Sequence, residues 1–574
     1  MTGNRRMCGR RGLRWSAACA AIAALALASA LIVYARTAHA STYAVYIPLD
    51  DPIYKELDTL NGLGLLYSYM DTIKPISRIE AARLVLEAER HYELHEQGED
   101  GLEDDDLARP ILRAMRAQLH EEIGWLEDRK ENNLPNLVHP LERLELQYVY
   151  SHGEAREEHI NQVNGANINF NEGTPLLPNN DALPTATGSN EIARASSWAG
   201  FGSFLTLYGE GAVAGPFTRS VSGPPGSDAR RVQPIDAEAV VSLGNTAISF
   251  GQEEMWWGVG HFAALSQSDN AAPFQALRVQ GIHPTHLPWF LKYLGLFRWN
   301  AFFGQLDDDR TFSRPWIDGQ NFSFKPLPNF EFGFTHAIEF GGYNNDHYNL
   351  SGFMGRASGL FTGNPLQGNT NSRGGVYLKL YVPKWRNSQF YFEILGEDNL
   401  TKEVPYVGRV LPFLARSYQG GWYLPRLTRD GLTDFRIEWA ILEPNYSQHS
   451  DSLYWTNDDR LMGDPMGPNA SQVDIDFGRW FMMKCKADLD IFYTERAPIW
   501  RPQINVHKER SVGGTLDLWT LPGPTPGTAG WLGDVKARSG FEYVHDINFG
   551  NSGSLRAILM LSFAIQPSWK SIEY

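Results

Sequence analysis

From Leu141 to the C-terminus, apolar side chains recur at every second position in many short segments. Residues two apart in a strand point to the same side, so this period predicts strands with one apolar face. Segments at 144–150, 376–381 and 541–543 have the pattern, and clusters of Gly, Pro, Asn and Asp separate them. The longest apolar face is in the last segment and consists of Leu555, Ala557, Leu559, Leu561, Phe563 and Ile565.

The N-terminus has the features of a secretory signal peptide. Five arginines between Arg5 and Arg14 precede an apolar run from Ala17 to Tyr34, and small residues follow at Ala38 and Ala40. This order of charge, apolar run and small residues predicts cleavage before Ser41, so that the first 40 residues are removed. The alternative is an uncleaved anchor, because the apolar run is barely long enough to span a bilayer.

No other stretch is long and apolar enough for a membrane helix, which leaves a soluble exported protein or a β-barrel. The signal peptide, the terminal aromatic residue Tyr574 and the many aromatic residues (17 Trp, 24 Tyr and 30 Phe) favour the barrel, because barrels carry aromatic girdles. We predict a large antiparallel transmembrane β-barrel over residues 136–574, in the outer membrane of a Gram-negative bacterium. At roughly 20–26 residues for a strand and its connection, this region holds about 16 to 20 strands. Polar stretches at 152–195, 344–372 and 447–472 are expected to be extracellular loops.

Residues 41–135 are predicted to form a small helical domain on the periplasmic side. Asp51 and Pro52 are typical of a helix start, and Gly62 is typical of its end. Ser77 and Glu80 have the spacing of a capping box at the start of a second helix. A third helix is expected where Leu112, Met115, Leu119, Ile123 and Leu126 follow one another at intervals of three and four.

The net charge argues against a nucleic-acid partner. The chain carries −15, and residues 1–40 contribute six arginines and no acidic residue, so cleavage would leave −21. Phosphate binding needs a basic surface, which this composition does not provide overall. An acidic polysaccharide remains compatible if a local basic patch offsets the field. After cleavage Cys485 is the only cysteine, so no intramolecular disulfide is expected.

No catalytic signature, cofactor motif or metal motif stands out, and we predict a non-enzymatic protein without cofactor or metal. His283 and His286 are three residues apart, but Pro284 argues against a helix that would present both to a metal. Three functions from different classes stay open at this point. They are a protein that binds and anchors surface polysaccharide, a diffusion porin for sugars or anions, and an outer-membrane hydrolase.

The segment 250–342 contains the densest run of motifs in the chain. It begins Phe-Gly-Gln-Glu-Glu-Met-Trp-Trp-Gly-Val-Gly at Phe250, and it closes with the aromatic–glycine strand 330–335 and a Gly-Gly pair. This order resembles the capsule-assembly Wzi family of outer-membrane proteins, except that Val259 stands where the family has Pro. The residues that match the family's motif are Gly251, Gln252, Trp256, Trp257, Gly258, Gly260, Ser266, Asn270, Ala271 and Pro273.

The resemblance implies a barrel of 18 strands with a periplasmic helical bundle, and a lectin-like role in holding capsular or related polysaccharide at the cell surface. Expected partners are that polymer, outer-membrane lipid and the polysaccharide export machinery, with the chain as a monomer. Trp256 and Trp257 are adjacent, so in a strand they face opposite sides, and one could face lipid and the other the lumen.

Aromatic and basic residues near the predicted loops are the candidate polymer contacts. An indole can cover the apolar face of a sugar ring, and a guanidinium can bind a carboxylate with two hydrogen bonds. The candidates are Arg373, Trp422, Trp455 and Arg460. The alternative is that they belong to the aromatic girdle or bind lipid head groups.

The signal-peptide pattern predicts the N-terminus of the mature protein. N-terminal sequencing of the chain from an outer-membrane fraction should begin at Ser41 or within a few residues of it. Intact Met1–Ala40 in that fraction would show that the segment is an anchor instead.

Overall fold

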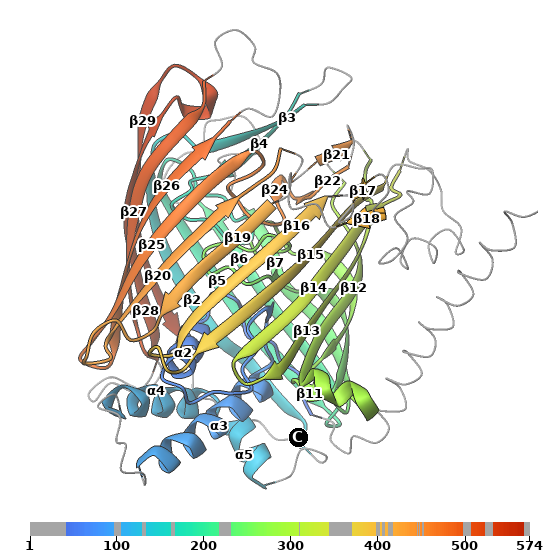
Figure 1. The fold of residues 1–574 in the computed structure, drawn as a ribbon, viewed down its shortest axis with the longest axis vertical. Helices are drawn as coiled ribbons and strands as arrows, with labels where there is room; N and C mark the ends of the chain where they lie inside the picture. The colour runs from blue at the N-terminus through green and yellow to red at the C-terminus, as the bar shows by residue number, and fades with distance from the viewer. Residues whose placement is uncertain are drawn as a thin grey trace, which may run out of the picture.

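A computed structural model describes residues 42–566 except 97–104, 129–133, 162–166, 217–230, 309, 311, 344–369, 398–401, 405–407, 411–416, 445, 447, 451–452, 498–506 and 523–531. The expected signal peptide, residues 344–369 of the predicted loop 344–372, and Tyr574 therefore lie outside the described residues. Within the described residues, eighteen long antiparallel strands form a closed barrel, with the helices at one end and long connections at the other (Figure 1). The barrel and its strand number are confirmed. We call these ends the helix end and the loop end.

The barrel strands follow one another around the wall in chain order, and closure comes from pairing of the first with the last. They are β2 (Leu137–His152), β5 (Gly188–Phe201), β6 (Leu205–Gly215), β7 (Arg231–Leu243), β8 (Thr246–Gln252), β10 (Gln275–Gly281), β12 (Leu296–Gln305), β13 (Trp316–Leu327), β14 (Phe330–Phe340), β15 (Thr370–Val382), β16 (Ser388–Glu397), β19 (Ser417–Leu424), β20 (Thr433–Ile441), β25 (Ala470–Phe481), β26 (Cys485–Arg496), β27 (Glu509–Thr520), β28 (Leu532–His545) and β29 (Gly553–Ile565).

Short strands lie inside the barrel and at its two ends. They are β1 (Ile73–Lys74), β3 (Arg156–Asn161), β4 (Asn167–Gly173), β9 (Trp256–Trp257), β11 (Thr285–His286), β17 (Lys402–Val404), β18 (Gly408–Val410), β21 (Gln448–Ser450), β22 (Leu453–Tyr454), β23 (Thr456–Asn457) and β24 (Arg460–Leu461). Two 3₁₀ helices, η1 (Trp289–Leu294) and η2 (Ile547–Phe549), complete the list of elements in these regions.

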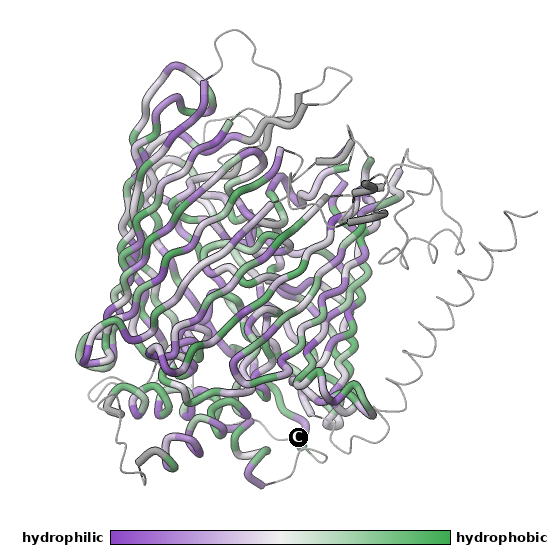
Figure 2. Tube along the Cα trace, viewed as in Figure 1, coloured by the Kyte–Doolittle hydropathy of each residue, from purple (hydrophilic) through white to green (hydrophobic). Residues whose placement is uncertain are grey.

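The period-two pattern places apolar side chains on the outside of the wall. In β29, Leu555, Leu559, Leu561 and Phe563 are exposed, whereas the intervening Arg556 and Ser562 are buried in the barrel. Hydropathy alternates in the same way along the other strands (Figure 2). A closed wall satisfies all the ladder hydrogen bonds and leaves an apolar outer surface, which suits a bilayer.

Four helices form the unit at the helix end: α2 (Ile53–Gly62), α3 (Arg78–Glu96), α4 (Asp105–Gln118) and α5 (His120–Asp128). The predicted starts hold, because Asp51 accepts a bond from the Ile53 amide and Ser77 accepts one from the Glu80 amide. The single third helix of the sequence analysis is wrong in one respect. The chain breaks at Leu119 into α4 and α5, although Leu119 stays fully buried and keeps the apolar face continuous.

The segment before and between these helices reaches into the barrel. Its apolar core includes Trp480 and Trp519 from the ends of β25 and β27. Lys379 of β15 lies 2.6 Å from Asp71, and Lys55 of α2 lies 3.2 Å from Asp488 of β26. Burial alone would raise the pKa of Asp71, but Lys379 and Lys74 lower it to about 2. Charged pairs as well as apolar contacts therefore fasten the N-terminal region to the wall. Among the helices that the structure describes, none is long and apolar enough to cross a membrane.

A charge on the outer face should disturb the barrel. Leu559 lies at the middle of β29 and is 46% exposed, so Leu559→Arg is expected to destabilise the membrane-inserted state by about 2–4 kcal/mol. The measurement is the fraction of heat-modifiable protein after refolding into lipid vesicles over a urea series. Leu94→Arg on α3, at 61% exposure and away from the barrel wall, is the matched control. Equal refolding of both variants would contradict the assignment of the outer face to lipid.

Candidate functional site

Residues 253–274, between β8 and β10, fold into the barrel, and we call them the inward loop. Their strand β9 pairs with β1 from the N-terminal segment, so Trp257 lies opposite Ile73 and Trp256 opposite Lys74. Trp257 has no exposed surface and packs against Phe302 of the wall, with 5.1 Å between the centroids of the two rings. The lumen is thus crossed by two segments that are far apart in the sequence.

Two buried glutamates of the wall hold the backbone of the inward loop. Glu438 of β20 accepts hydrogen bonds from the amides of His261 at 2.8 Å and Phe262 at 3.2 Å. The same carboxylate accepts bonds from the Tyr391 hydroxyl at 2.7 Å and the Gln419 amide at 3.1 Å. Glu393 of β16 accepts the amide of Val259 at 3.2 Å. A carboxylate bonded to backbone amides satisfies donors that the lumen would otherwise leave unpaired.

The glycines of the motif permit this close approach. At Gly258, φ is +148°, and a Cβ atom would lie 2.8 Å from a Glu393 oxygen. At Gly260, a Cβ atom would lie 2.0 Å from the Ala263 carbonyl oxygen and 2.2 Å from the Gln419 side chain. A side chain at either position would push the loop away from the wall.

A second loop, residues 442–469, covers the inward loop from the loop end. Ser268 donates to the Gly463 carbonyl at 2.6 Å, and Asn270 donates to the Leu461 carbonyl at 3.0 Å. The polar composition of 447–472 predicts an extracellular loop. The described part instead contains Tyr446, Leu453, Trp455 and Met462 with at most 2% exposure, and β25 already begins at Ala470. The period-two alternation of apolar residues is absent from the second loop because this loop packs against other loops and is not part of the barrel wall.

The remaining motif residues also have structural positions. Gln252 donates to the carbonyl of Pro273 at 2.9 Å and so joins the two ends of the inward loop. Gly251 has φ +150°, and Ala271 packs in an apolar cluster with Trp257. The suggestion that one of the adjacent tryptophans faces lipid is wrong, because β9 belongs to the luminal two-stranded sheet and not to the wall. Ser266 completes the set and contacts Thr335 of β14 through its hydroxyl at 3.2 Å.

The structure brings together three of the four candidate polymer contacts. The guanidinium carbon of Arg373 lies 4.2 Å from the centroid of the Trp455 ring. Arg460 lies in β24, which pairs with β23, the strand that begins immediately after Trp455. Arg373 and Trp455 are only 2% and 1% exposed, so they are not at the surface of a loop as expected. Trp422 lies in an aromatic group with Trp385, Phe390 and Phe435, beside the tight β15–β16 turn at the helix end. That these residues contact a polymer stays a prediction.

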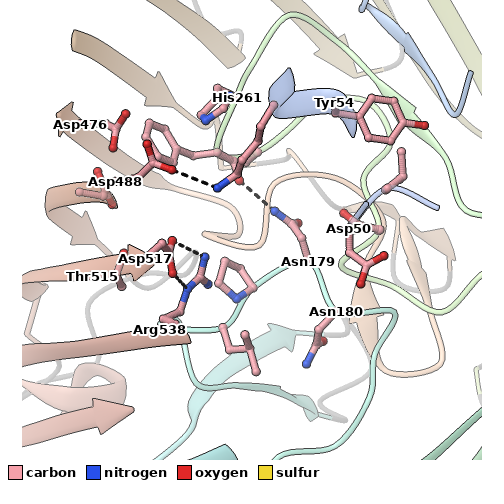
Figure 3. Close-up of a pocket in the computed structure, with 18 of the residues that line it drawn as sticks. Asp50, Tyr54, Asn179, Asn180, His261, Asp476, Asp488, Thr515, Asp517 and Arg538 are labelled. Atoms are coloured by element: carbon pink, nitrogen blue, oxygen red, sulfur yellow. Dashed lines mark hydrogen bonds and ion pairs between the residues drawn. The ribbon is translucent and has the colours of Figure 1, made fainter. Parts of the chain in front are cut away.

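A cavity of ≈ 430 Å³ lies in the lumen between the inward loop, α2 and the wall. Figure 3 shows its lining, with His261 from the inward loop, Tyr54 from α2, and Asp476 and Asp488 from the wall. Burial lowers the pKa of His261 well below its usual value, and Arg436 lowers it further, so the imidazole is neutral at pH 7. The cavity therefore combines a neutral histidine with many ionisable side chains of the wall.

Three of the wall carboxylates in the cavity, those of Asp434, Asp488 and Asp517, form ion pairs. Lys486 lies 2.9 Å from both Asp434 and Asp488, and Arg538 binds Asp517 with two bonds of 2.6 and 2.8 Å. Oxygens of Asp434, Asp476 and Asp488 lie within 4.8 Å of one another, a spacing that a cation could use. The Lys486 ammonium already forms ion pairs with two of these three carboxylates, so the three aspartates have a counter-charge within the chain.

Sequence reasoning missed the residues that hold the loops in place. Glu393, Glu438 and Gln419 are the polar members of strands that alternate with outward apolar residues, and dozens of other positions share that pattern. The only available signal was an inward-facing acid in the middle of a strand. Which of these acids meets the inward loop depends on the register around the barrel.

The comparisons with known proteins agree with this architecture. The family model for the capsule assembly protein Wzi matches residues 161–520. An uncharacterised 55.8 kDa protein in the cps region of Klebsiella pneumoniae is 24% identical over 299 residues, which cover 49% of this chain. The aligned part spans 57% of that relative. A solved structure of Wzi from Escherichia coli, described as a carbohydrate-binding outer-membrane β-barrel involved in group 1 capsule assembly, superposes with a TM-score of 0.62. The identity is 16%, and the alignment covers 92% of this chain and all of that one.

The closed wall, the apolar exterior and the loops packed into the lumen define a transmembrane β-barrel of the outer membrane. Since the family model matches well over half of the chain, this protein belongs to the Wzi family of capsule assembly proteins, as its motif resemblance predicted.

Removing the central acceptor should release the inward loop. Glu438→Ala leaves the amides of His261 and Phe262 without an acceptor, at a cost on the order of 3 kcal/mol. We expect the inward loop to become sensitive to added protease and the barrel to show larger stepwise currents in planar bilayers than the wild type. The control is Glu495→Ala, whose carboxylate pairs with Lys508 and Arg510 at the rim. Wild-type conductance and protease resistance in Glu438→Ala would contradict the assigned role.

Proposed function

We propose that the protein is a lectin-like outer-membrane barrel that holds or organises capsular or related polysaccharide at the cell surface. The observation that carries the proposal is the filled lumen of a Wzi-family barrel. Side chains of the inward and second loops, among them Trp257, Leu265 and Trp455, are 0 to 1% exposed inside the wall. Such a barrel offers a binding surface built from loops and not a wide water path.

The orientation of the chain follows from the lengths of its connections. The β7–β8 and β13–β14 turns at the helix end contain two residues each, and transmembrane barrels keep their short turns in the periplasm. We therefore propose that the helical unit, residues 41–135, lies on the periplasmic side with its segment around β1 inside the lumen, that the loop end is outside the cell, and that the barrel covers residues 136–574. In this orientation the helices are accessible to polysaccharide export machinery and the loops to the finished polymer. We propose a monomer, because the closed wall leaves no strand edge for a second copy.

We propose binding without catalysis. A glycosidase needs two carboxylates with separate roles in one cleft. In the cavity, Asp434 and Asp488 share Lys486, and Asp517 is paired with Arg538, so these acids are engaged in balancing charge. The loop packing likewise favours anchoring over the porin alternative of the sequence analysis.

Deletion of the gene tests the proposal. Loss of the protein should leave total polysaccharide unchanged and shift polymer from the cell-bound fraction to the medium, measured as uronic acid or total sugar in both fractions. Complementation with the intact gene should restore the cell-bound fraction. Unchanged cell-bound polymer would contradict the anchoring role, and a fall in total polymer would point to synthesis or export instead. Large open-channel currents from the purified wild-type protein would favour the porin.

A further inference from the structure

One guanidinium at the loop end is buried with no directly paired carboxylate among the described residues. Arg156, the first residue of β3, is 5% exposed and donates a single hydrogen bond, from Nη1 to the Pro465 carbonyl at 3.2 Å. Its Nε is buried with no acceptor, and no carboxylate among the described residues forms an ion pair with it. Buried charges in proteins are normally paired, because desolvation of a lone ion costs several kcal/mol.

Two more buried arginines, Arg496 and Arg556, are close enough to interact with Arg156. Arg496 at the end of β26 pairs with Glu509 at 3.1 Å, and Arg556 of β29 pairs with Glu542 at 2.9 Å. Both of these arginines are 1% exposed, and Nη2 of Arg556 has no hydrogen-bond partner. Among the described residues, the ion pairs of these three guanidiniums involve two carboxylates, and the buried carboxylate of Asp464 interacts with Arg156 without forming an ion pair with it. We call the three arginines the arginine cluster.

Arg156 keeps its charge in this position. Burial lowers the pKa of Arg156, and the nearby Arg496 lowers it further, so that the pKa is about 10. At neutral pH the side chain is therefore protonated in nearly all molecules. The carboxylates of Glu542, Glu509 and Asp464 act on this charge, but none of them forms an ion pair with Arg156, so a directly bound anion would still stabilise it.

The arginine cluster borders the luminal cavity at its loop end. Arg156 lines that cavity together with Pro465 and Met466 of the second loop, and β3 lies across the loop end of the barrel (Figure 1). Further along the same cavity the wall carries Asp474, Asp476 and Asp490. The cavity is therefore positive beside β3 and acidic along β25 and β26.

We propose that Arg156 forms a subsite for the carboxylate of an acidic sugar residue, which enters from the loop end and supplies the missing negative charge. With Nη1 engaged by Pro465, the Nε–Nη2 edge remains, and this edge presents two parallel donors that match the two oxygens of a carboxylate. A uronic acid residue of a surface polysaccharide has this group. The inference rests on the proposed function, since it names the chemistry of the polymer that the barrel holds.

The position of Arg156 also accounts for retention in place of passage. A carboxylate bound there is attracted to the arginine cluster at the loop end of the barrel. An anionic chain would thus be held at the rim, which is the behaviour expected of an anchor.

Binding of a small probe to the purified full-length protein in detergent tests the subsite. Sodium glucuronate should raise the thermal unfolding midpoint of the wild type in a saturable way, while glucose and sodium chloride at the same ionic strength should not. Arg156→Gln should weaken glucuronate binding about tenfold or more, the loss expected for a charge-assisted pair. Without ligand, this variant should unfold at the same or a higher temperature than the wild type, because an unpaired buried charge is removed.

Arg510→Gln is the matched control, since it removes the same charge from the second residue of β27, where the side chain is 59% exposed. It should bind glucuronate like the wild type. Wild-type affinity in Arg156→Gln would overturn the subsite. Equal protection by chloride would also overturn it, because the cluster would then need only an inorganic counter-ion, and equal protection by acetate would show a site for carboxylates in general and not for a sugar.

The whole-cell experiment separates this inference from the proposed function. If deletion releases polymer but Arg156→Gln cells and their purified protein behave like the wild type, only the subsite fails. If deletion releases no polymer, the anchoring function fails, whatever glucuronate does to the purified protein.

Discussion

Pairing of β2 with β29 joins the two ends of the wall and closes the barrel. The closed interior then determines which partners the inward-facing side chains can have. Nine register pairs from Leu144–Ile565 to His152–Ala557 make this seam. Once the wall is closed, inward side chains have neither lipid nor bulk water around them. Each charged group on the inner face then needs a partner from the wall, from a loop or from a ligand.

The inward loop and the N-terminal segment meet much of this need. Backbone amides of 259–262 donate to Glu393 and Glu438, and Thr72 donates to Glu331 at 2.8 Å. In the same way Asp71 and Lys55 pair with Lys379 and Asp488 of the wall. The contents of the lumen are thus part of the fold, and their removal would leave buried carboxylates and amides unpaired. This dependence keeps the inward loop and the N-terminal segment inside the lumen.

The arginine cluster departs from this pattern of internal balance. Elsewhere in the lumen, Lys486 and Arg538 are matched to carboxylates within 3 Å. Arg156 has only a carbonyl at 3.2 Å, and it lies at the end of the barrel where a polymer would arrive. A buried guanidinium without a directly paired carboxylate at the rim of the barrel is a physical basis for recognising an anion.

The sequence alone determined that the chain forms strands with one apolar face, because period-two alternation reports the two faces of each strand and needs no long-range information. The signal-peptide pattern, the aromatic content and the terminal Tyr574 then favoured a barrel over a soluble exported protein. The sequence also located the helix starts at Asp51 and Ser77, where a cap depends on residues within three positions, and the motif that identifies the family. Tertiary structure decided the rest. Leu119 interrupts a helix whose periodicity continues, Trp256 and Trp257 both turn into the lumen, and the second loop is buried although its composition is polar. Trp422 is separated from Arg373 and Trp455 by the length of the wall. Arg156 attracted no attention in the sequence, because the absence of a partner becomes visible only when strands far apart in the chain are placed side by side.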